Sequence, residues 1–384
     1  MGYLRGWVPF QPMVFYVLLS LSDKLQAPYE YDVYRFAHLP IEQITYVFAG
    51  GAIASLLADV FARPIARRVG WKISGALLLL MLVHSCVLKY AEDPRSLITS
   101  KILARVGLIT IFPLAVGQFH PLCVPGELFV ILTIGVTGML AGFVGTIVCD
   151  IVYFQPTQMF FYAYIVLIAT LVVHGVGGSS QPIKRLTPPG FQDPIINNVV
   201  ATLSFAFWTT STVVEMYWSP LCRGTALQVG MVYAIFCLCQ VLGNCTHKIF
   251  VLQETSYRYA LTMSTMLASI GMFFAFVGCF VYAKGTVVFI MSLFTYHFAV
   301  GMLGSVMRNI RCQTSVSSFK ESVCRSLGRV AGAGLILYGD LSELKTRNVF
   351  MVLFVIMFLT IWYVQFQLAE WKRPKTEKVL RVYE

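Results

Sequence analysis

The chain has 384 residues and a formal net charge of +11, and 57% of its residues are hydrophobic while only 12% are charged. A soluble domain carries about 25% charged residues, so this composition excludes a soluble protein and indicates one that lies in a membrane. The basic residues are too dispersed along the chain to form one basic face, which argues against a nucleic-acid-binding protein.

Runs of about 20 mostly apolar residues predict the membrane-spanning helices. In chain order these runs cover 10–36, 41–60, 72–90, 97–119, 122–149, 157–176, 194–219, 225–247, 258–282, 285–308, 320–338 and 347–370. The first run is followed by SDKLQAP (22–28) rather than by a small-residue cleavage site, so we expect a retained helix and not a signal peptide. The expected fold is therefore an all-α polytopic membrane protein.

Most of the basic residues lie in connections on the same side of the membrane as the N-terminus. Cytoplasmic loops carry an excess of Lys and Arg, so we predict that both termini are cytoplasmic. GVGGSSQPIKRLTPPGFQDP (175–194) is the longest polar interruption between apolar runs and divides the twelve helices into six and six. We expect a six-helix half at 1–176, a short cytoplasmic linker at 177–193, and a second six-helix half with a short basic tail at 194–384. Two such repeats around a midplane site form the major facilitator fold.

The connection after the second helix of each half has a similar pattern. LLADVFARPIARRVGWK (56–72) and VLGNCTHKIFVLQETSYR (241–258) each have an acid or amide with a cation four residues later. The first resembles the cytoplasmic loop signature of the superfamily, in which an acid pairs with arginines in one conformation and releases them in the other. We predict a gating role for both; the residues are Asp59, Arg63, Arg67, Arg68, Asn244 and Lys248. A merely positive-inside loop is the alternative, and it explains the arginines but not Asp59.

DKLQAPYEYDVY (23–34) resembles the D-W-L-Q-A-P-Y-x-Y-x-L-Y stretch in the first helix of the eukaryotic molybdate-anion transporter family of the major facilitator superfamily. WSP (218–220), LKTRNVF (344–350) and, with a small gap, SVCRSLG (322–328) match further motifs of that family in the same order. The resemblance implies a divergent plasma-membrane carrier of molybdate. One departure is TSKILARVGLITIFPLAVGQFH (99–120), which has no acidic residue where the family has one.

Charged residues inside membrane helices are expected to face a partner or a watery cavity. The predicted substrate site consists of Asp23, Lys24, Gln26, Tyr29, Arg105, Glu215, Arg325 and Arg329. Consecutive residues lie about 100° apart on a helix, so we expect Asp23 and Lys24 not to neutralise each other. An excess of guanidinium groups would bind an oxyanion, and Asp23 or Glu215 would carry an exchanging proton. Structural ion pairs between helices are the alternative.

Five residues have other or additional expected places. We expect Lys101 to snorkel to the outer interface, and Tyr29 and Tyr31 are open to an alternative as interfacial anchors. Gly138 and Gly142, four residues apart, predict a helix face that allows another helix to approach closely.

Three classes of function remain open from the sequence. The first is a secondary transporter of an inorganic oxyanion, molybdate by resemblance, with sulfate and phosphate as tetrahedral alternatives. The second is a non-transporting receptor, sensor or scaffold of the same fold, which the missing acid at 99–120 favours. The third is a membrane enzyme, which the lack of HExxH, GxSxG and paired intramembrane aspartates argues against. We expect no metal or cofactor, since the ten cysteines form no CxxC pair and the six histidines show no metal-binding spacing. We also expect a monomer.

Overall fold

The structure is a computed structural model, and all secondary structure in its described residues is helical. The described residues are 10–91, 93–116, 124–153, 155–177, 194–222, 228–252, 257–279, 285–313, 318–339 and 343–370. The elements of the first six spans are α1 (Phe10–Gln26), η1 (Ala27–Tyr29), α2 (Glu30–Phe36), α3 (Ile41–Leu57), η2 (Ala58–Ala62), α4 (Arg63–Val69), α5 (Trp71–Leu88), α6 (Pro94–Val116), α7 (Val124–Gly145), η3 (Thr146–Tyr153) and α8 (Thr157–Gly177). Those of the last six are α9 (Pro194–Cys222), α10 (Val229–Leu252), α11 (Tyr257–Gly278), α12 (Gly285–Gln313), α13 (Ser318–Gly339) and α14 (Glu343–Glu370).

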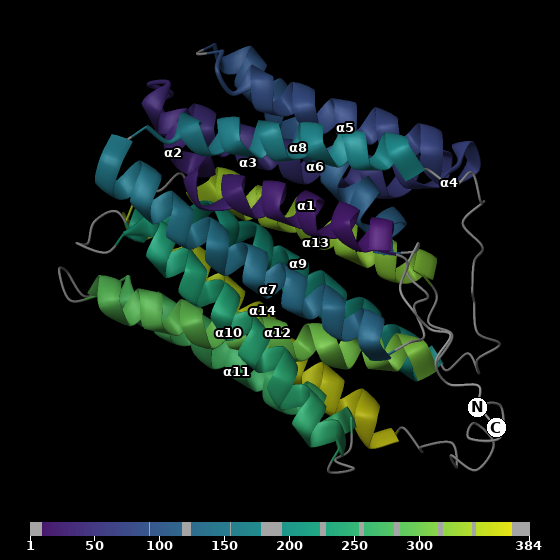
Figure 1. Cartoon of the computed structure of the whole chain (residues 1–384). Coiled ribbons are helices and arrows are strands. Elements are labelled where there is room, and N and C mark those ends of the chain that lie inside the picture. The colour runs from purple at the N-terminus through teal and green to yellow at the C-terminus, as the bar shows by residue number, and fades with distance from the viewer. Residues whose placement is uncertain are drawn as a thin grey trace, which may run out of the picture.

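The helices lie side by side along one common direction (Figure 1), as expected for a membrane bundle. Once consecutive elements are joined, the described helices correspond to the predicted spans, and ten stretches are long and apolar enough to cross a membrane. The first span is broken at η1, where Pro28 supplies no backbone N–H for a helical hydrogen bond. The polytopic all-α fold predicted from the sequence is therefore confirmed.

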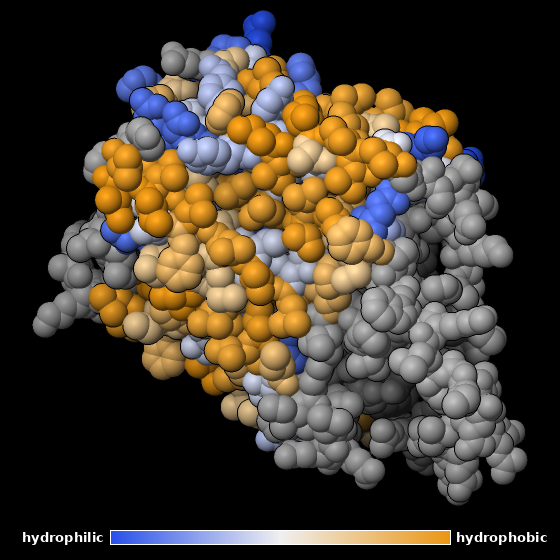
Figure 2. Space-filling model, in the orientation of Figure 1, coloured by the Kyte–Doolittle hydropathy of each residue, from blue (hydrophilic) through white to orange (hydrophobic). Residues whose placement is uncertain are grey.

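The outer surface of the bundle is strongly apolar, as a protein surrounded by lipid requires. Hydrophobic side chains cover most of the described surface on the face shown in Figure 2. Large apolar side chains are exposed on several helices, among them Phe143 on α7 and Leu359 and Trp362 on α14. A soluble monomer rarely exposes such large contiguous apolar patches. The chain is a multi-pass integral membrane protein.

Helices of the two expected halves meet along two main contacts, α7 against α10 and α3 against α13. We call the two ends of the bundle the α2 end, on the left of Figure 1, and the α4 end, on the right. The division of the chain at 177–193 remains a prediction, because the linker lies outside the described residues.

The predicted small-residue face of α7 is confirmed. A Cβ atom added at Gly142 would lie 2.8 Å from Ala234 Cβ and 2.9 Å from Ala234 N on α10, and one added at Gly138 would lie 2.9 Å from Cys237 Cβ. Contacts below 3.0 Å force a neighbour to move, so the close approach of α7 and α10 depends on glycine at these positions.

Replacing Gly142 by leucine is therefore expected to separate α7 from α10 and to lower the free energy of unfolding by about 1–3 kcal/mol. Thermal unfolding of the purified protein in detergent measures the change. Gly50→Leu is the control, because a Cβ atom at Gly50 on α3 would meet no described atom within 4 Å. An equal shift for the two variants would contradict the proposed contact.

Candidate functional site

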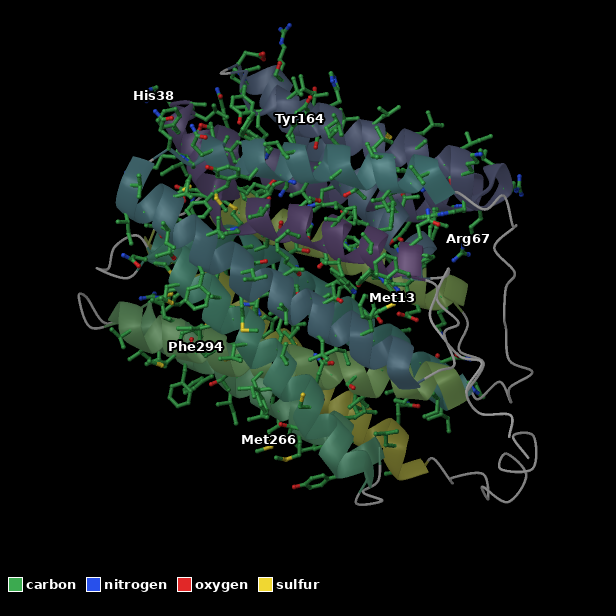
Figure 3. All side chains as sticks on the ribbon, viewed as in Figure 1. Met13, His38, Arg67, Tyr164, Met266 and Phe294 are labelled. Atoms are coloured by element: carbon green, nitrogen blue, oxygen red, sulfur yellow. The ribbon has the colours of Figure 1, made fainter. Side chains whose placement is uncertain are left out.

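A cavity of about 580 Å³ lies in the middle of the bundle, within the size range of small-molecule sites in proteins. Its walls come from α1, η1, α2, α6, α7, α9, α10 and α12. The first, fourth, seventh and tenth spans, which are α1 with α2, α6, α9 and α12, thus all contribute to the wall. Side chains fill most of the remaining space between the helices (Figure 3).

The aromatic part of the cavity wall comes from α9 and α10. Trp218 stacks on Tyr233 with ring centroids 5.9 Å apart, and it packs edge-on against Phe236 at 5.3 Å. Trp208 lines the cavity nearer α13, where its ring lies 4.1 Å from the guanidinium carbon of Arg329. These rings give the cavity rigid apolar walls beside its charged groups.

Four charged side chains of the wall and one lysine behind it are linked by ion pairs. We call them the central charge cluster: Glu30, Lys101, Arg105 and Glu215 in the wall, and Lys89 outside it. Lys101 Nζ lies 2.5 Å from Glu30 Oε2 and 3.3 Å from Glu215 Oε1. Arg105 forms a second ion pair with Glu215. Glu215 on α9 therefore bridges two cations on α6, and it joins the two expected halves across the cavity.

Glu30 anchors the other side of this cluster. Its Oε1 accepts a hydrogen bond from Lys89 Nζ at 3.1 Å, and the same lysine donates to the hydroxyl of Tyr34 at 2.6 Å. Lys89 is buried, with 3% of its surface exposed. One carboxylate thus holds a lysine from α6 and a second lysine just beyond the end of α5.

The prediction that Lys101 snorkels to the outer interface is wrong. Lys101 is only 1% exposed, and its ammonium group lies 4.5 Å above the ring of Phe48 in addition to its two carboxylate partners. The position along the helix suggested an interface, but carboxylates from α2 and α9 compensate the buried charge.

The prediction that Asp23 and Lys24 do not neutralise each other is also wrong. Lys24 Nζ lies 3.3 Å from Asp23 Oδ2, because the long lysine side chain spans the angle that separates the two Cα positions. Both side chains are about one quarter exposed, and both line the cavity together with Gln26, another residue of the predicted substrate site. Their participation in binding stays a prediction.

The expected cationic excess is absent from the described cavity wall. Three cations and three carboxylates line it: Lys24, Lys101, Arg105, Asp23, Glu30 and Glu215. Two of the predicted cations, Arg325 and Arg329, do not line this cavity, and Glu30, which was not among the predicted site residues, adds a carboxylate. A glutamate within the recognised stretch 23–34, one residue after Tyr29, was the available signal.

Tyr29 and the two arginines of α13 lie outside the large cavity. Tyr29 is fully buried and donates a hydrogen bond to Asp150 Oδ2 at 3.0 Å, so it is not an interfacial anchor. Arg325 pairs with Glu321 on its own helix at 2.9 Å. Arg329 lines a small adjoining pocket of about 30 Å³ together with Arg105 and Glu215.

Asp59 joins η2 to α13 near the α4 end. Its Oδ2 accepts hydrogen bonds from Ser326 Oγ and Arg329 Nη1, each at 3.1 Å, and its Oδ1 lies 3.2 Å from Arg63 Nη1. Asp59 is 6% exposed and sits in a π-helical turn, a distortion that is frequent at functional sites. Asp59, the predicted gating acid, is thus paired with Arg63 in its own half and with Arg329 in the other expected half.

The remaining predicted gating residues are placed differently. Arg67 and Arg68 lie exposed in the last turn of α4, and Arg67 marks the α4 end in Figure 3. Asn244 lies within α10, inside the apolar run predicted at 225–247, where its Nδ2 donates to the Gln240 carbonyl at 2.8 Å and its side chain lines the cavity. Its gating role stays a prediction. The apolar helix continues beyond the predicted end at 247. Lys248 also lies in α10, but its side chain is outside the described part of the chain.

No protein-family model matches the chain. Over 82 residues the chain is 33% identical to the molybdate-anion transporter of Xenopus tropicalis, and this match covers 21% of the chain and 18% of that protein. The matched segment thus spans about a fifth of each protein. The similarity to a molybdate-anion transporter inferred from the motifs is confirmed over that segment.

Solved structures of transporters match nearly the whole chain. The xylose transporter XylE from E. coli, in a partially occluded inward-open conformation, superposes with a TM-score of 0.72 at 11% identity, over 92% of this chain and 96% of that chain. An auto-inhibited peptide transporter of the POT family gives 0.75 at 10% identity, over 96% and 99%. The human organic anion transporter MFSD10 gives 0.60 at 13%, over 93% and 99%. The chain thus has the major facilitator fold, and it is a divergent relative in sequence of a molybdate-anion transporter.

Proposed function

We propose that this protein is a secondary active transporter that moves an inorganic oxyanion, with molybdate as the substrate suggested by its relative, by alternating access. The observation that carries the proposal is the bridge from Glu215 to Lys101 and Arg105. A carboxylate is itself an oxyanion, so these two cations already coordinate negatively charged oxygens in the cavity. A substrate oxyanion takes the place of the Glu215 carboxylate and receives the paired donors of the Arg105 guanidinium.

The charges of the central cluster favour a divalent anion that enters together with a proton. Lys89, Lys101 and Arg105 outnumber the two carboxylates by one, which gives the cluster a net charge of +1. When Glu215 binds a proton, the charge becomes +2 and balances a dianion such as molybdate. Glu215 is the most exposed partner, with 37% of its side chain accessible, so it is the carboxylate that exchanges the proton.

Two networks support the alternating opening of the two ends. At the α4 end Asp59 binds Ser326 and Arg329 on α13. Toward the α2 end Asp150 on η3 accepts hydrogen bonds from Tyr29 and, at 3.3 Å, from the backbone N–H of Gly230 on α10. Each network joins the expected halves, and in the proposed cycle one is released while the other stays intact. The protein acts as a monomer in the plasma membrane with both termini in the cytoplasm.

The segment 99–120 has no acidic residue, which favoured a non-transporting receptor in the sequence. That argument is weaker in the folded protein, because other helices supply acidic groups to this segment. Glu30 and Glu215 place two carboxylates against α6 from neighbouring helices. The segment therefore has acidic partners although its own sequence provides none.

Uptake of radiolabelled molybdate into proteoliposomes tests the proposal. We expect uptake by the wild-type protein above that of empty vesicles, with unlabelled sulfate and phosphate as competitors that define the substrate. A wild-type protein that takes up none of the three anions at any pH tested would refute oxyanion transport.

Glu215→Gln is expected to remove the pH dependence of uptake. In the wild-type protein the uptake rate falls as pH rises, because an ionised Glu215 competes with the anion for Lys101 and Arg105. Glutamine has no such charge at any pH. Initial uptake rates measured across a pH series check this. Glu42→Gln, an exposed acid on α3, is the matched control and retains the wild-type profile. If the pH profile of Glu215→Gln is identical to that of wild type, a group other than Glu215 binds the exchanging proton.

A further inference from the structure

His297 on α12 is a cavity residue that the ion pairs above leave unused. Its ring stacks on Phe236, with centroids 4.3 Å apart and planes 27° from parallel. Its Nδ1 lies 2.9 Å from the amide nitrogen of Gln240 on α10. Stacking and hydrogen bonding together fix the position of the imidazole in the cavity wall.

The contact with Gln240 determines which ring nitrogen carries hydrogen. An amide nitrogen donates and does not accept, so Nδ1 is the acceptor and the neutral imidazole carries its hydrogen on Nε2. The Nε2 atom is buried, yet it has no hydrogen-bond partner among the residues that the structure describes. A buried donor without an acceptor loses its hydration and gains nothing in return, so an acceptor is expected at this position.

The surroundings indicate the chemistry of that acceptor. Lys24 on α1, which is paired with Asp23, lines the same cavity as His297, so a ligand in the cavity can meet an ammonium group as well as the imidazole. Tyr296, which precedes His297 in the cavity wall, and Ser211 on α9 form a hydrogen bond with each other at 2.9 Å. An oxygen atom of an anion is the acceptor that matches a donor N–H beside an ammonium group.

We propose that His297 is a substrate-binding residue whose Nε2–H donates a hydrogen bond to an oxygen of the transported oxyanion. This inference rests on the proposed function and adds to it a contact from the second half of the chain. Lys101 and Arg105 bind the anion from α6, whereas His297 binds it from α12. A tetrahedral anion offers oxygens in several directions, so it can be held from both sides as it moves through the cavity.

Two amide substitutions separate the roles of the two ring nitrogens. His297→Gln places an amide N–H near the position of Nε2, and His297→Asn reaches only as far as Nδ1. Both side chains are polar and neutral, so the variants differ mainly in the contact that is tested. The matched control is His84→Asn, at an exposed histidine on α5.

Equilibrium binding of radiolabelled molybdate to the purified proteins gives the readout. We expect Kd to rise about tenfold or more in His297→Asn, to stay within about threefold of wild type in His297→Gln, and to be unchanged in His84→Asn. Equal affinities of the Asn and Gln variants would overturn the role of His297 while leaving oxyanion binding intact. A wild-type protein that binds no molybdate, sulfate or phosphate would overturn the proposed function, and this inference with it.

Discussion

Arg105→Ala is expected to reduce molybdate uptake by at least about 30-fold. Arg105 lines the central cavity and pairs with Glu215, and truncating one partner of a hydrogen-bonded charge pair in a binding site costs about 2–5 kcal/mol. Without this guanidinium the central charge cluster has two cations and two carboxylates, so its net charge falls to zero. The anion then loses both its paired donors and the charge that attracts it. Initial uptake rates in proteoliposomes measure the loss.

Two further arginines make this prediction specific. Arg95 lies exposed in the first turn of the same helix, and Arg95→Ala should leave uptake unchanged. Arg325 pairs with Glu321 outside the large cavity, so Arg325→Ala should weaken uptake less than Arg105→Ala does. If Arg105→Ala folds and transports as well as Arg95→Ala, the anion does not bind at the central cluster.

Asp59→Asn is expected to destabilise the closed state of the α4 end in the proposed cycle by about 3–5 kcal/mol, because it leaves the buried guanidinium of Arg329 without its carboxylate partner. The side chain of Asp59 is 1% exposed and that of Arg329 is 7% exposed, so water compensates little of the lost charge. We expect faster labelling of Cys324, on the same helix as Arg329, by a membrane-impermeant maleimide. A lower midpoint of thermal unfolding is expected in parallel.

A double variant tests the same contact. In Asp59→Asn/Arg329→Gln the unpaired charge of Arg329 is gone and only that of Arg63 remains, so the double variant should lose less stability than the sum of the two single variants. Asp93→Asn removes an exposed acid and serves as the control. Additive losses in the double variant, or an Asp59→Asn protein with wild-type labelling and unfolding, would show that this network does not hold the α4 end closed.

The fold was accessible from the sequence because membrane helices depend on a local property, the length of an apolar run. The same holds for Pro28, whose missing N–H interrupts the first span wherever the neighbouring helices lie. It also holds for Gly142, because a small residue on a helix face permits close approach whatever the partner. These features require no knowledge of which helices become neighbours.

The pairing of charges was not accessible in the same way. Helical periodicity puts Lys101 and Arg105, four residues apart, on one face of α6, but it does not reveal that Glu30 and Glu215 meet them from α2 and α9. Nor does it reveal that Asp59 and Arg329, 270 residues apart, are partners. Ion pairs between helices depend on tertiary arrangement and on the reach of long side chains. The pattern therefore identified charges that must be compensated, but not the groups that compensate them.

The charge count of the central cluster also determines how the proposed cycle responds to membrane voltage. With a dianion bound and a proton on Glu215 the cluster is neutral, whereas the empty cluster with an ionised Glu215 carries one positive charge. Loaded reorientation then moves no net charge, and the return of the empty carrier moves one positive charge outward. An inside-negative potential opposes that return by about 2.3 kcal/mol per 100 mV for each charge that crosses the full field. In the empty carrier the ionised Glu215 cancels one of the two positive charges that the dianion would otherwise neutralise. The voltage therefore acts on a single charge during the return step.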